Sequence, residues 1–106
     1  MDASEYQKAT MDTAIYPPEK ALEYLALGLV SEAGEVAGII KKIIRGDDNI
    51  DFGTYDAMKE LGDVLWYVAQ LCDLFNLDMG VVMRGNIEKL EDRKLRGVIK
   101  GSGDDR

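Results

Sequence analysis

Residues 31–42 (SEAGEVAGIIKK) and their echo at residues 59–67 (KELGDVLWY) set the architecture of this chain. Each segment holds two carboxylates three positions apart, and the four acids are Glu32, Glu35, Glu60 and Asp63. Positions three apart share one face of an α-helix. If both segments are helices that face each other, four carboxylates meet at one point and repel one another unless a cation lies among them. The spacing therefore predicts two helices that meet at a cation-binding site.

These acids do not belong to the solvated faces of the two predicted helices. At about 100° per residue, Leu25 falls within roughly 20° of Glu32, and Glu35 lies at the edge of the same apolar arc. Glu60 lies in the middle of the apolar face of the second helix, and Asp63 lies at its margin. An unpaired ionised carboxylate on a packing face costs several kcal/mol. The pattern therefore favours a bound cation over four solvated acids.

The same helices carry four glycines near the acids: Gly28, Gly34, Gly38 and Gly62. Each glycine inside a helix costs about 1 kcal/mol relative to alanine. Two explanations carry equal weight, namely close approach of a neighbouring helix and room for a ligand.

The composition indicates one acidic domain. The 106 residues carry a net charge of −7, which opposes binding to nucleic-acid backbones and to anionic membranes. There is no histidine and a single cysteine, Cys72, so a structural zinc site is excluded, whereas Mg²⁺ or Mn²⁺ remains open. The N-terminus does not resemble a signal peptide, and no apolar run approaches the roughly 18 residues of a membrane helix. We therefore expect a cytoplasmic protein in which Cys72 is an inert core thiol.

Capping and stop signals predict four helices. A capping-box pattern at Ser4 and Gln7 opens the first, Gly46 ends the second, Thr54 caps the third and Asp78 caps the fourth. The expected helices span about residues 4–14, 18–44, 54–75 and 79–95, with a loop over residues 46–53. We expect a helical domain over residues 1–95 and an irregular, glycine-rich tail over residues 96–106, which is mobile unless it binds something.

The predicted fourth helix presents a cationic face. Asn86, Lys89 and Arg93 lie on one side of it. Lys89 and Arg93 are suited to phosphate oxygens, and Asn86 to a hydroxyl group or to the support of a metal ligand. A solvated helix face is the alternative explanation.

The paired acids resemble the signature of the all-α nucleoside triphosphate pyrophosphohydrolases of the MazG type. GLVSEAGEVAGIIKK and KELGDVLWYVAQL are similar to the two signature helices of that family, and residues 86–90 (NIEKL), followed by Arg93, resemble its N-x-x-K-L element. The resemblance implies an all-α bundle of four to five helices that assembles as a homo-oligomer. A dimer of dimers is the first expectation and a dimer the second, with neighbouring subunits completing the pocket.

The resemblance also implies a reaction: Mg²⁺-dependent hydrolysis of (deoxy)nucleoside triphosphates to monophosphate and pyrophosphate, which clears the nucleotide pool. The residues implied as both catalytic and metal-binding are Glu32, Glu35, Glu60 and Asp63, with Glu32 our choice of general base. The residues we assign to substrate binding are Asn86, Lys89, Arg93, Lys42, Gln7 and Trp66. Some relatives carry an extra acid at the position of Ser31, so the number of metals stays open here.

Two other classes of protein place acids inside helices. A non-catalytic helical oligomeric interaction module would use the carboxylate pairs structurally, and its stability would not respond to Mg²⁺. A di-iron bundle requires Glu-x-x-His pairs, which a chain without histidine does not provide. The preferred base and sugar of the nucleotide do not follow from the sequence.

Overall fold

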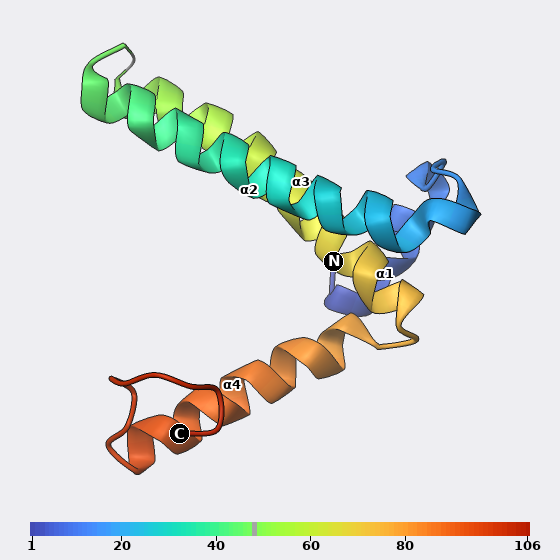
Figure 1. The fold of residues 1–106 in the computed structure, drawn as a ribbon, viewed down its shortest axis with the longest axis vertical. Helices are drawn as coiled ribbons and strands as arrows, with labels where there is room; N and C mark the ends of the chain where they lie inside the picture. The colour runs from blue at the N-terminus through green and yellow to red at the C-terminus, as the bar shows by residue number, and fades with distance from the viewer. Residues whose placement is uncertain (48) are drawn as a thin grey trace.

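The computed structural model describes residues 1–47 and 49–106, and none of the described residues lies in a strand (Figure 1). Its elements, in chain order, are α1 (Ala3–Thr10), η1 (Met11–Thr13), η2 (Pro18–Lys20), α2 (Ala21–Arg45), α3 (Ile50–Leu74) and α4 (Met79–Leu95). The predicted all-α class is confirmed. No helix of the described chain has the length and apolarity to cross a membrane.

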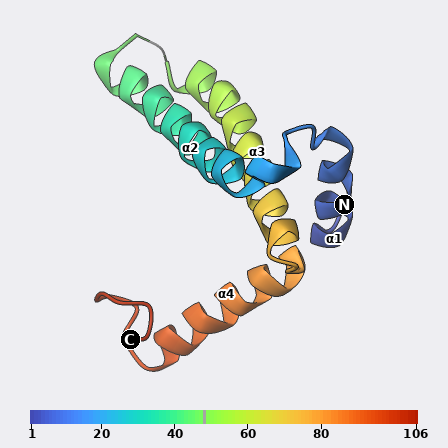
Figure 2. The same ribbon diagram turned by 45° about the vertical axis from the view of Figure 1, so that its right-hand side comes forward.

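The helices α2 and α3 form a long antiparallel hairpin, which Figures 1 and 2 show from two directions. Each helix has 25 residues. A Cβ atom at Gly28 would overlap the ring of Tyr67, and one at Gly53 would overlap the side chain of Ile43. By contrast, a Cβ at Gly34 would meet no atom within 4 Å. Close helix approach therefore explains Gly28, whereas open space surrounds Gly34.

The boundaries of the hairpin differ in part from the prediction. Gly46 ends α2 in the left-handed region, at φ +90°, which glycine adopts without steric cost. The side chain of Asn49 caps α3 by accepting a hydrogen bond of 3.0 Å from Phe52 N. The prediction that Thr54 caps α3 is wrong, because Thr54 lies inside the helix and donates to Ile50 O at 2.7 Å. The predicted loop is correspondingly shorter, and Asp48 within it lies outside the described residues.

The start of α1 is also capped differently from the prediction. Asp2, rather than Ser4, is the N-cap, and it forms a reciprocal capping box with Glu5. Both carry carboxylates, and an aspartate accepts as readily as a serine from the free N–H groups of the first turn.

A buried amide attaches α1 to the hairpin. Gln70, 1% exposed, accepts a hydrogen bond from Tyr16 Oη at 2.6 Å and donates one to Thr10 Oγ1 at 2.9 Å. The small buried apolar cluster nearby consists of Ala69, Cys72 and Met79. Burial raises the pKa of the Cys72 thiol, in agreement with an inert core thiol.

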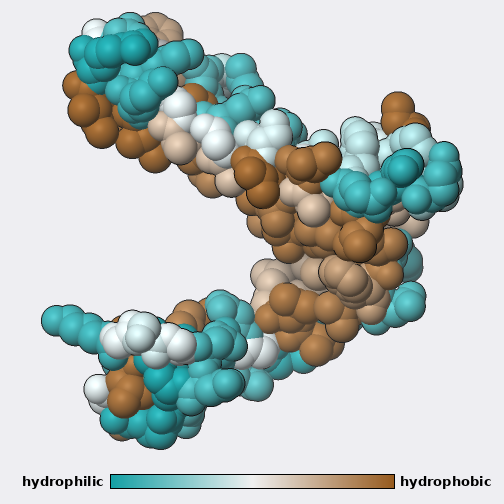
Figure 3. Space-filling view, viewed as in Figure 1, coloured by the Kyte–Doolittle hydropathy of each residue, from teal (hydrophilic) through white to brown (hydrophobic). Residues whose placement is uncertain are grey.

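The single chain is open rather than compact. From its junction with α3, α4 runs away from the hairpin (Figure 1), and the radius of gyration is 16.6 Å. A compact domain of about 100 residues has a radius of gyration near 13 Å. Apolar side chains gather along the hairpin and its junction with α4 (Figure 3), and Leu27 and Val30 are each 71% exposed. One chain therefore leaves much of its apolar surface uncovered.

Candidate metal and nucleotide site

The hairpin brings three of the predicted acids to one place. Carboxylate oxygens of Glu32 on α2 and of Glu60 and Asp63 on α3 lie within 4.8 Å of one another. Glu32 and Glu60 are half-buried and Asp63 is exposed, the order expected from their angles on the two helices. The i, i+3 spacing within α3 and the pairing of α3 with α2 together produce the cluster.

One oxygen of this cluster has no partner within the described chain. Glu32 Oε2 is buried without a hydrogen-bond donor. A buried polar group in that condition costs about 1–3 kcal/mol, and more when it is charged. Three carboxylates from two rigid helices are also the oxygen-rich donor set that Mg²⁺ and Mn²⁺ prefer. The residues present therefore fit a divalent cation.

Glu35 lies at the edge of the same cluster. A hydrogen bond with Glu60, and the negative charge of Glu60, raise the pKa of Glu35 above its ordinary value, and contact with Glu32 partly opposes this. Two carboxylates share a proton in this way when no cation separates them. The structure thus brings all four predicted acids together, and their binding of metal stays a prediction.

An aromatic hollow opens on one side of the acids. It encloses ≈ 390 Å³ and is lined by Thr13, Glu32, Asp63, Trp66 and Tyr67. The Trp66 indole N–H donates to Thr13 Oγ1 at 2.8 Å, and the Trp66 and Tyr67 rings meet edge to face at 5.0 Å. Burial, contact with Tyr24 and the nearby acids raise the pKa of Tyr67 to about 12, so its hydroxyl stays protonated.

A lysine-lined hollow opens beside Glu35 and Glu60. It encloses ≈ 510 Å³, and its cations are Lys41, Lys42 and Lys59. Lys42 was among the residues predicted to bind substrate, whereas Lys41 and Lys59 were not. The register of α3 against α2 places Lys59 near the end of α2, and no pattern within either helix carries that information.

The remaining predicted substrate contacts lie elsewhere in the single chain. The Gln7 amide joins α1 to the start of α4, since it donates to Leu77 O at 2.9 Å and accepts from Met79 N at 2.8 Å. Asn86, Lys89 and Arg93 lie along α4, which runs away from the hairpin (Figure 1). The structure therefore does not bring these α4 residues to the acids of the same chain.

Comparison with known proteins assigns the chain to a family. The sequence profile of the MazG nucleotide pyrophosphohydrolase domain matches residues 20–97, a range that contains all four acids. The chain belongs to the MazG nucleotide pyrophosphohydrolase family. It is also 46% identical, over 114 aligned positions that cover 100% of both chains, to the "Gene 37 protein" of Mycobacterium phage L5. No solved structure matches it.

MazG membership confirms the family predicted from the paired acid motif. The profile match ends at Gly97, just after α4, so it spans the hairpin, the acid cluster and the cationic face of α4. Residues 98–106, which lie beyond it, are the rest of the tail.

Proposed function

We propose that this MazG protein hydrolyses nucleoside or deoxynucleoside triphosphates between the α and β phosphates, releasing a monophosphate and pyrophosphate. One observation carries the proposal: the acid cluster lies between an aromatic hollow and a lysine-lined hollow. Aromatic rings stack on bases, and lysines bind phosphate oxygens. The arrangement suits a nucleotide whose base lies at Trp66 and whose phosphates extend toward Lys42. Clearance of unwanted nucleotides is the role we infer.

The acids would hold the metal, and other side chains would hold the substrate. Bound among Glu32, Glu35, Glu60 and Asp63, Mg²⁺ (or Mn²⁺) would offset the charge of the triphosphate and lower the pKa of water. Glu32 Oε2, buried and without a donor, is suited to accept the proton of the attacking water. Lys42, with Lys41 and Lys59 beside it, would stabilise charge on the departing pyrophosphate.

A second copy of the chain would supply the α4 contacts. Asn86 and Lys89 lie away from the acids of their own chain, and large apolar side chains along the hairpin remain exposed. Association would cover that surface and bring α4 of one copy to the acid cluster of another. We propose a homo-oligomer, a dimer of dimers before a dimer, with shared sites.

The test is a panel of nucleoside and deoxynucleoside triphosphates incubated with the protein and Mg²⁺, scored for pyrophosphate and for orthophosphate. We expect pyrophosphate and the monophosphate in equal amounts, and the panel also identifies the preferred base and sugar.

Glu60→Ala should abolish turnover while leaving a folded oligomer. Glu88→Ala, which changes an exposed residue on α4, should leave turnover intact. Orthophosphate as the first product, or an active Glu60→Ala variant, would overturn the proposal. No stability gain with Mg²⁺ would support the interaction module instead.

A further inference from the structure

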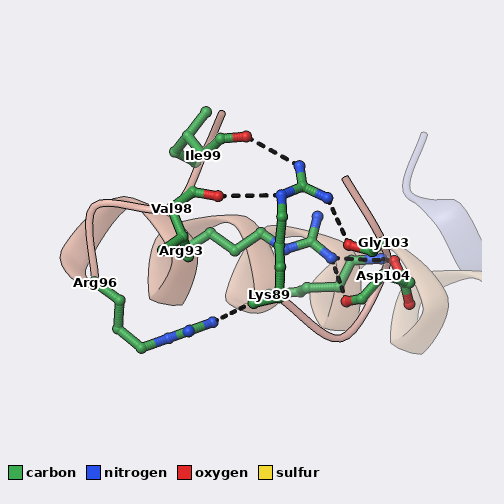
Figure 4. Close-up of polar contacts among 8 residues, drawn as sticks. Lys89, Arg93, Arg96, Val98, Ile99, Gly103 and Asp104 are labelled. Carbon is green, nitrogen blue, oxygen red and sulfur yellow. Dashed lines mark hydrogen bonds and ion pairs between the residues drawn. The ribbon is translucent and has the colours of Figure 1, made fainter. Parts of the chain in front are cut away.

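The tail after α4 has a defined path. Residues 96–106 turn back along α4 (Figure 4), held by the guanidinium of Arg106, which donates to the carbonyl oxygens of Val98 at 3.1 Å and Ile99 at 2.9 Å. Arg96 in turn donates to Arg106 O at 2.7 Å. Gly101 has φ +134°, where a side chain would be strained and would crowd Arg106. The tail was predicted to be mobile unless it binds something, and in this structure it binds α4 itself.

Arg93 lies beneath this tail. It is only 5% exposed, and its guanidinium donates to the Asp104 carboxylate at 3.1 Å and to the Asp104 carbonyl oxygen (Figure 4). A phosphate group cannot reach the guanidinium while the tail occupies it. In this structure Arg93 anchors the tail, whereas the sequence predicted a substrate contact.

Lys89 shares the same carboxylate oxygen. Its ammonium donates to Asp104 Oδ1 at 2.8 Å, and its side chain is 40% exposed. A lysine ammonium carries three N–H donors, so one bond to Asp104 leaves donors for a ligand. These two cations lower the pKa of Asp104, which keeps the carboxylate charged near neutral pH.

We propose that Asp104 is a positioning residue for Lys89: the tail, anchored on buried Arg93, fixes the Lys89 ammonium in the place where it binds phosphate. A free lysine side chain loses about 2 kcal/mol of rotamer entropy when it is immobilised. A side chain that is already held loses less of it when the ligand arrives, so the ligand binds more tightly. The proposal rests on the proposed function for its ligand, a polyphosphate.

The test compares Asp104→Asn with Asp104→Glu, using Asp105→Asn as the matched control on the next, exposed residue. Calorimetry with inorganic pyrophosphate and Mg²⁺ measures binding without turnover. Asp104→Asn should weaken pyrophosphate binding about tenfold and raise KM similarly, because a neutral amide oxygen accepts a weaker hydrogen bond from the Lys89 ammonium than a carboxylate does. We expect kcat to change less than about twofold. Asp104→Glu should restore most of the affinity, and Asp105→Asn should match the wild type.

Tail order is followed separately by trypsin, whose cleavage after Lys100 releases residues 101–106 for mass spectrometry. We expect faster release from Asp104→Asn than from Asp105→Asn. Faster release with unchanged pyrophosphate binding would make the tail merely structural and overturn the proposal. Tighter binding by Asp104→Asn would also overturn it, since Asp104 would then compete with phosphate. If Asp104→Asn weakens pyrophosphate binding but the wild type turns over no nucleotide, the proposed reaction fails and this inference stands.

Discussion

The proposed chemistry depends first on single carboxylate atoms. Glu32 Oε2 is buried without a donor, and carboxylate oxygens of Glu32, Glu60 and Asp63 lie within 4.8 Å of one another. An arrangement of this kind is unfavourable in the absence of a cation, because each charge raises the free energy of the others. Metal binding at this cluster, as proposed, would therefore be an exchange of part of the stability of the hairpin for the capacity to hold the ion.

Glu32→Gln tests that exchange. Without divalent metal, the variant should be more stable than the wild type by about 1 kcal/mol, because one of several repelling charges is removed. Mn²⁺ or Mg²⁺ should raise the Tm of the wild type clearly and that of the variant little, since ligands that bind the native state stabilise it. Thermal unfolding with and without metal measures both. Glu88→Gln, which is exposed on α4, is the control, and an equal Tm gain in Glu32→Gln would contradict the prediction.

The tail should respond to acid. The pKa of Asp104 is held below its ordinary value of 3.8 by Lys89 and Arg93. A lowered pKa in the folded state means that the stabilisation is complete above pH 3.8 and is lost as pH falls through the lowered value. We expect a titration of carboxyl carbons by nuclear magnetic resonance to give Asp104 a pKa below the ordinary value of 3.8. The tail should loosen over the same range, and a pKa of Asp104 at or above 3.8 would refute its ion pairs.

The ends of the helices show how local chemistry fixes the hairpin. Asn49 takes the cap position and accepts a hydrogen bond from the N–H of Phe52. As a result α3 begins at Ile50, and Gly53 lies within its first turn. Gly53 then lies buried against Ile43 of α2. The early start therefore adds a glycine contact that tightens the far end of the hairpin.

Two substitutions separate the observed cap from the predicted one. Asn49→Ala should destabilise the protein by about 1 kcal/mol, because a free N–H group of the first turn of α3 loses its acceptor. Thr54→Ala should be close to neutral or slightly stabilising, since alanine is the better residue inside a helix. Urea unfolding of both variants gives the comparison. A larger loss from Thr54→Ala than from Asn49→Ala would move the start of α3 back to the predicted position.

The shape of the entire chain points to association. An open arrangement of hairpin and α4 leaves an apolar hollow of ≈ 700 Å³ on α3, lined in part by Met58, Leu61 and Leu65. Each of these side chains is at least half exposed in the single chain. Burial of such surface contributes about 25 cal/mol per Å², so covering it with a second copy would lower the free energy of the assembly.

Leu61→Asp tests this surface. The charge should shift the protein toward smaller species, because an aspartate in a buried interface loses its hydration without gaining a partner. Sedimentation velocity over a range of concentrations measures the change. Ile15→Asp, at a 93% exposed position away from the hollow, is the control. Identical sedimentation of Leu61→Asp and the wild type would show that the hollow is not an interface, and loss of turnover with dissociation would fit shared sites.

Local periodicity was enough to predict the four helices, the four acids and the faces on which they lie. The angular position of a side chain on a helix depends on neighbours within one or two turns, so Glu32 and Glu60 could be placed on packing faces from sequence alone. Tertiary structure alone decided three other features: the register that places Lys59 of α3 beside Lys41 and Lys42 of α2, the departure of α4 from the hairpin, and the return of the tail to Arg93. Each depends on contacts between segments distant in the chain or on a turn closed by several weak bonds, and helix periodicity carries no information about either.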